Sequence, residues 1–186
     1  MKTLVLAAAL LALAAPVYAQ NATDQMKNGQ PPTKASAATQ KFVKTAAITD
    51  MFEIQAGKLA QEKAENQAYK DFAQMTIDDH TKTSNELKGM NVGVQLPQDL
   101  DSAHKTKIEK LNSLSGAAFE RQYKTDQVEG HKQAIALFER YSKSGDNAQL
   151  KQWAQTTLPT LKSHLQHAEA LPRPAPAPTV GSGKRR

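Results

Sequence analysis

Apolar residues recur at steps of three and four along the chain between residues 39 and 171. This spacing places them on one face of an α-helix. Runs of β-branched residues that alternate with polar residues, the pattern typical of strands, are missing from the same stretch. The pattern therefore predicts an all-α protein.

The helical pattern divides into four long segments and one short segment. We expect long helices at residues 39–64, 67–90, 117–144 and 146–171, and a short helix at residues 102–114. Asn66 and Asp101 are suitable N-cap residues, while Gly116 and Gly145 interrupt the pattern. Tight turns join the first two and the last two long helices, which predicts a four-helix bundle. The connection over residues 91–115, which holds the short helix, is long enough to cross the bundle, although a simple up-down-up-down order remains open.

The first 19 residues form a separate segment. Lys2 supplies a positive start, an apolar run extends over residues 4–15, and small residues precede Gln20. This pattern predicts a secretory signal peptide cleaved between Ala19 and Gln20. No cysteine follows that could carry a lipid anchor. We therefore expect an exported bacterial protein of the periplasm or the periphery of the outer membrane, with no membrane-spanning segment after cleavage.

The ends of the mature chain differ in composition from its middle. The composition predicts three segments after the signal peptide. They are a disordered polar leader at residues 20–38, the helical domain at residues 39–171 and a disordered tail rich in proline and alanine at residues 172–186. Lys2 and four basic residues of the tail account for five of the six net positive charges. The helical domain is nearly neutral, whereas domains that bind nucleic acid are typically basic, so we do not expect nucleic-acid binding. The basic tail either contacts anionic lipid or cell-wall polymer, or is simply a solvated end.

Polar residues stand at several positions where the long helices are expected to face the core. His80 shares a helical face with Tyr69, Phe72 and Leu87, at a position where leucine would be expected. Every long helix offers at least one such residue on or beside its apolar face. The candidate ligands of a buried metal site are Glu53, His80, Asp126, His131 and His164.

The depth of these residues along the bundle is similar. With a rise of about 1.5 Å per residue, Glu53 lies about 18 Å and His80 about 22 Å from the first turn. His131 lies about 21 Å and His164 about 28 Å from the second turn by the same rise. We therefore expect Glu53, His80 and His164, with either His131 or Asp126, to meet near the middle of the bundle.

Three phrases in the helical segment also carry a resemblance to a known family. They are FEIQAGKLA at residues 52–60, DHTK at residues 79–82 and LPTLKSHL at residues 158–165. In this order and spacing, the chain over residues 45–171 resembles the domain-of-unknown-function 4142 family, exported bacterial proteins often labelled outer membrane proteins. The resemblance implies a ferritin-like helical bundle and no particular activity.

Two readings of the polar core remain open. Imidazole and carboxylate groups together bind transition metals such as iron or zinc. A standard di-iron centre is not expected, because Ile77, Val128 and Leu161 stand where its Glu-x-x-His pairs need glutamate. Alternatively, a hydrogen bond between Glu53 and His80 fixes the register of two helices without metal.

These readings lead to two hypotheses about function. The first is a non-catalytic envelope protein that has a structural role or binds an unidentified partner. The second is a metal-binding protein for storage, sensing or redox protection. The sequence holds neither a nucleophile elbow nor a phosphate-binding loop, so no catalytic residue is assigned.

Overall fold

The computed structural model describes residues 34–174, which form five α-helices and contain no strand. The all-α prediction is therefore confirmed for this part of the chain. The helices are α2 (Ala37–Lys63), α3 (Gln67–Gly89), α4 (Ser102–Ser113), α5 (Gly116–Ser144) and α6 (Ala148–Ala170). Each end lies within two residues of its expected position. The expected signal peptide, residues 20–33 of the expected leader and residues 175–186 of the expected tail lie outside the described residues.

Side chains at the helix starts explain why the helices begin where they do. The side chains of Asn66, Asp101 and Asn147 accept hydrogen bonds from backbone N–H groups in the first turns of α3, α4 and α6. Ser36 does the same for α2. Such bonds satisfy N–H groups that have no partner within the helix.

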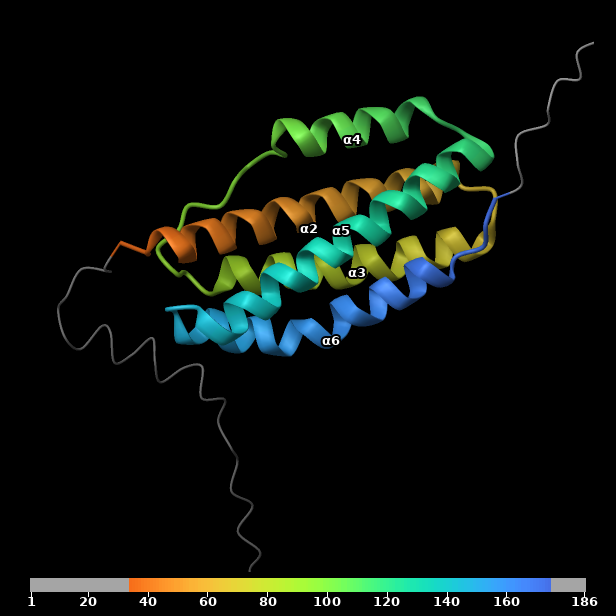
Figure 1. Cartoon of the computed structure of the whole chain (residues 1–186). Helices are drawn as coiled ribbons and strands as arrows, with labels where there is room; N and C mark the ends of the chain where they lie inside the picture. Colours follow the sequence, from red (N-terminus) through yellow and green to blue (C-terminus); the bar gives the residue numbers. More distant parts are fainter. Residues whose placement is uncertain (1–33, 175–186) are drawn as a thin grey trace, which may run out of the picture. The chain divides into compact units, whose positions relative to one another are not determined.

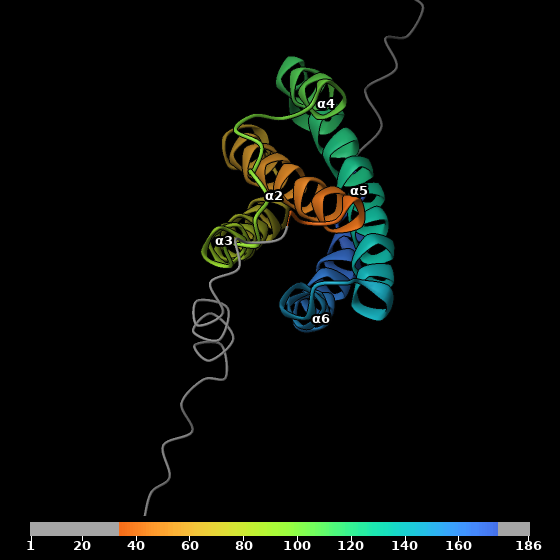
Figure 2. The same ribbon diagram turned by 90° about the vertical axis from the view of Figure 1, so that its left-hand side faces the viewer.

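The four long helices form two antiparallel hairpins that pack together. α2 packs on α3, α5 packs on α6, and the hairpins meet through contacts of α2 with α5 and of α3 with α6. Figure 1 shows the long helices side by side, with α4 outside them along α2. In the turned view of Figure 2, α4 lies at the edge formed by α2 and α5, so it takes no place in the centre.

Hydrogen bonds at both ends of the bundle fix the direction of α5. At one end, the hydroxyl groups of Thr39 and Tyr141 lie 2.6 Å apart. At the other end, the carboxylate of Glu120 accepts hydrogen bonds from the backbone N–H groups of Glu65 and Asn66. The start of α5 thus lies beside the end of α2, so the connection through α4 crosses the length of the bundle.

Two apolar clusters occupy opposite ends of the bundle. One surrounds Phe42, Tyr141 and Trp153, and the other surrounds Tyr69 and Phe119. Buried polar residues separate the clusters at mid-length. The charged or amide-bearing members of this polar layer are Asp50, Glu53, His80, Gln127, His131 and His164.

None of the helices between residues 34 and 174 is both long and apolar enough to cross a membrane.

Candidate metal centre

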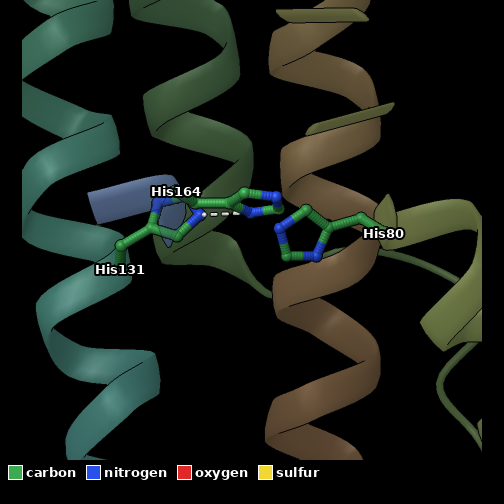
Figure 3. Close-up of side chains that lie close together, drawn as sticks. All are labelled: His80, His131 and His164. Atoms are coloured by element: carbon green, nitrogen blue, oxygen red, sulfur yellow. Dashed lines mark hydrogen bonds between the residues drawn. The ribbon is translucent and has the colours of Figure 1, made fainter. Parts of the chain in front are cut away.

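Three histidines from three different helices meet in the polar layer. His80 of α3, His131 of α5 and His164 of α6 are each at most 3% exposed. Each offers a ring nitrogen, and these three nitrogens lie within 4.8 Å of one another. Figure 3 shows the three rings turned toward one another. Within residues 34–174, these three histidines are the only group of three or more histidine or acidic side chains whose ligand atoms lie close enough to hold a metal ion.

An oxygen atom outside the cluster contacts the other nitrogen of each ring. His80 Nδ1 lies 2.8 Å from Asp50 Oδ1, and His131 Nδ1 lies 2.8 Å from the backbone carbonyl oxygen of Gln127. His164 Nε2 lies 2.9 Å from Asp79 Oδ2. Metal-binding histidines are commonly oriented in this way, by an oxygen acceptor at the nitrogen that does not bind the metal.

These contacts determine which nitrogens carry hydrogen. A carbonyl or carboxylate oxygen accepts, so His131 donates through Nδ1 and His164 donates through Nε2. The remaining nitrogens, His131 Nε2 and His164 Nδ1, face each other at 3.3 Å, as the dashed line in Figure 3 marks. When both rings are neutral, two lone pairs meet there and no proton lies between them.

The separation of these two nitrogens matches that of two ligands of one metal ion. Two imidazole nitrogens about 2.0–2.1 Å from a tetrahedral zinc ion lie about 3.3 Å apart. The contact between His131 and His164 has this length. Nε2 of His80, the third nitrogen, is buried and has no hydrogen-bond partner among the described residues. One pair of nitrogens thus has the separation of two ligands of one ion, and the third nitrogen lies within 4.8 Å of both and has no other partner among residues 34–174.

Burial and neighbouring negative charges shift the pKa of His80 in opposite directions. Burial lowers the pKa of His80, but the hydrogen bond and negative charge of Asp50 outweigh it and raise the pKa overall. Burial also raises the pKa of Asp50 itself. Because the 2.8 Å contact and further negative charges favour the imidazolium, we place the proton of this pair on His80. A metal ion at the centre would replace a proton on this ring.

The other two histidines favour the neutral form. Burial lowers the pKa of His131, and the charge of Glu53 opposes this only in part. Burial also lowers the pKa of His164, to about 4, against the opposing hydrogen bond with Asp79. Neutral imidazole is the form that binds metals.

The two carboxylates among the expected ligands lie differently from the histidines. Glu53 is 1% exposed, and its Oε2 atom has no hydrogen-bond partner within the described part of the chain. A Cβ atom added at Gly130, beside His131 in the chain, would lie 3.4 Å from Glu53 Oε1. Asp126 is also buried, but its contacts are with Gln122 and Lys107. The structure thus puts Glu53 near the histidines and does not include Asp126 among them.

One pairing considered from the sequence differs from the observed one. The hydrogen bond between Glu53 and His80 is wrong, because Asp50 contacts His80 instead. Asp79, the neighbour of His80 in the chain, contacts His164 across the bundle. Asp50 was missed in the sequence although it lies one turn before Glu53 and four residues after Ala46, on the same helical face.

Fold and site together define an all-α bundle protein with a buried histidine cluster. The chain belongs to the family described as "Domain of unknown function (DUF4142)", which matches residues 24–171. No curated protein matches the chain.

A solved structure supports the fold independently. The chain is similar to the crystal structure of a DUF305 fragment from Deinococcus radiodurans, with a TM-score of 0.65 and 13% sequence identity. The similarity covers 74% of this chain and 97% of that fragment. At this identity, the likeness concerns the fold alone.

Proposed function

We propose that this protein binds one divalent transition metal ion, such as zinc or iron, through His80, His131 and His164. The observation that carries the proposal is the 3.3 Å contact between two ring nitrogens whose hydrogens are directed elsewhere. A purely structural polar core would place a hydrogen between such groups, because buried polar atoms are normally hydrogen-bonded.

The helix directions support a ferritin-like relationship. The long connection carries the chain from the end of α3, beside the start of α2, to the opposite end of the bundle before α5 begins. Such a crossover occurs in ferritin-like folds. The absence of glutamates three residues before the histidines argues for a mononuclear centre in place of a di-iron one. Binding of a single ion suits storage, sensing or redox protection.

Metal titration of the mature, untagged protein tests the proposal. We expect about one zinc ion per chain and a higher melting temperature with zinc, because a ligand at 100 times its Kd stabilises the folded state by about 2.7 kcal/mol. The double variant His80→Ala, His164→Ala should lose both effects.

A matched control removes two histidines outside the cluster. His104 and His167 are at the surface or partly exposed, so the variant His104→Ala, His167→Ala should bind zinc like the wild type. If the wild type binds no metal, or if both double variants respond alike, the polar layer has a structural role only. In that case the buried contact of Asp50 with His80 fixes the register of α2 and α3.

We further propose an envelope location, in the periplasm or at the outer membrane. The support is the signal-peptide pattern of residues 1–19. Cell fractionation with an antibody against the helical domain tests it. Protein found only in the cytoplasmic fraction at full chain length would exclude export.

A further inference from the structure

Glu53 is a buried acidic residue whose Oε2 atom receives no hydrogen bond from any residue that the structure describes. It comes from α2, the one long helix that contributes no histidine to the cluster. Its Oε1 atom lies against α5 at Gly130, next to His131. All four long helices thus bring a group with metal-binding atoms to the same layer.

Among residues 34–174, Glu53 forms no ion pair and its Oε2 atom has no hydrogen-bond partner. Asp50, one turn earlier on α2, already contacts Nδ1 of His80. The negative charge of Glu53 raises the pKa of both His80 and His131, so the carboxylate acts electrostatically on the cluster. Burying a carboxyl group without a hydrogen-bond partner is costly, and a cation in the cluster would offset that cost.

We propose that Glu53 is the fourth ligand of the centre and closes it around the metal ion. This inference rests on the proposed function. Glu53 is not among the residues whose ligand atoms already lie within 4.8 Å, so the proposal requires its side chain to turn toward the histidines when an ion binds.

The resulting ligand set defines the class of metal. Three imidazoles and one carboxylate suit zinc, cobalt or iron in the divalent state, whereas copper(I) prefers the sulfur of cysteine or methionine. Four protein ligands without an open position are typical of structural zinc sites, while catalytic sites keep a position for water. We therefore infer that the centre does not activate water.

Cobalt(II) loading of the full mature chain provides the test, because the visible absorption of cobalt reports its ligands. The variants are Glu53→Ala, Glu53→Gln and, as a matched control for loss of a buried acid, Asp126→Asn. We expect cobalt affinity to fall at least about ten-fold in both Glu53 variants. It should stay within two-fold of the wild type in the control.

Thiocyanate titration distinguishes a ligand from a residue that only positions the histidines. The cobalt spectrum of Glu53→Ala should change with thiocyanate, because a coordination position is open, and that of the wild type should not. Formate, which replaces the missing carboxylate, should restore the wild-type spectrum. If wild type and Glu53→Ala respond alike, or if Glu53→Gln matches Asp126→Asn in affinity and spectrum, the fourth-ligand assignment is wrong.

The outcomes separate this inference from the proposed function. Failure of the wild type to take up cobalt overturns the metal centre as a whole. Uptake through the histidines with no effect of Glu53 overturns only the fourth ligand. Circular dichroism establishes that each variant is folded, and Glu53→Gln, which keeps the side-chain shape, decides the question if Glu53→Ala does not fold.

Discussion

The oxygen atoms that orient the three histidines differ in their exposure to solvent. The side chain of Asp50 is 8% exposed, whereas that of Asp79 is 41% exposed. Water can therefore replace the carboxylate of Asp79 when it is removed, but it has little access to the place of Asp50. This difference leads to unequal effects of the two aspartates on stability.

We expect Asp50→Ala to destabilise the metal-free protein more than Asp79→Ala. Removing Asp50 leaves His80 buried without its partner, at a cost of about 1–3 kcal/mol and more for a charged ring. Loss of a partly exposed pair typically costs about 0–1 kcal/mol. Urea unfolding measures both, and equal losses would contradict the assignment.

The pair can also be removed as a whole. Replacing both Asp50 and His80 by leucine should recover much of the loss seen for Asp50→Ala, because neither member of the pair then remains buried and unpaired.

Asp126 offers a prediction of pH dependence away from the histidines. Burial raises the pKa of its carboxyl, although the hydrogen bond from Gln122 opposes this. A raised pKa means that the folded state holds its proton more tightly than the unfolded state, so the ionised group reduces stability above pH 3.8. Asp126→Asn should therefore raise the melting temperature relative to wild type at pH 7.

The difference in melting temperature between Asp126→Asn and the wild type should shrink as the pH falls from the raised pKa of folded Asp126 toward the pKa of the unfolded state. The wild-type carboxyl is then protonated and uncharged, like the asparagine side chain. Thermal melts between pH 3.5 and pH 7 follow the trend. A difference that grows on acidification would show that the charge of Asp126 stabilises the fold.

The sequence allowed the histidines to be assigned to one level of the bundle, because helical rise and facing can be calculated from residue number. It did not allow a choice between Asp50 and Glu53 as the partner of His80. The two carboxylates lie one turn apart on the same face, and the choice depends on the relative shift of α2 and α3. Asp126 is buried as its position suggests, but α4 covers it with Lys107, a contact that helical periodicity cannot predict.

At the scale of the helices, a close approach between α2 and α3 depends on one glycine. A Cβ atom added at Gly57 would lie 2.7 Å from Ile77 Cγ1 and 3.2 Å from the backbone oxygen of Ala73. At Gly89, the last residue of α3, an added Cβ would meet nothing within 4 Å. The two glycines therefore serve as a matched pair for substitution.

Gly57→Ala should destabilise the protein by about 1–3 kcal/mol through overpacking, less the gain in helix propensity. Gly89→Ala should be neutral or stabilising by up to about 1 kcal/mol. Denaturant unfolding of both variants checks the contrast. A gain in stability for Gly57→Ala would mean that the hairpin separates without cost.

Helix ends could be predicted closely because capping residues such as Asn66 and Asn147 stand beside each break. The direction of α5 relative to α2 could not be predicted from the sequence. The connection over residues 91–115 is long enough either to cross the bundle or to join neighbouring helix ends in an up-down-up-down order. Contacts between distant residues decided it, with Glu120 bonded to the backbone at the start of α3 and Tyr141 beside Thr39.

For the described domain as a whole, the metal ion should connect both hairpins and leave α4 largely unaffected. α4 contributes Leu111 to the core and no residue to the histidine cluster. Hydrogen exchange with and without zinc should therefore show added protection in α2, α3, α5 and α6 near the centre and little change in α4. Uniform protection that includes α4 would instead indicate stabilisation of the entire domain.

The positions of the ligands also bear on the order of events during folding. His131 and His164 lie on the hairpin of α5 and α6, while His80 and its partner Asp50 lie on the hairpin of α2 and α3. These two contacts lie within one hairpin each, whereas the contact of His164 with Asp79 and the meeting of the three histidines form only when the hairpins dock. Bonds that form after the rate-limiting step slow unfolding and leave the folding rate unchanged. A bound ion would then chiefly slow the unfolding of this protein and lengthen the lifetime of the state in which the two hairpins are docked.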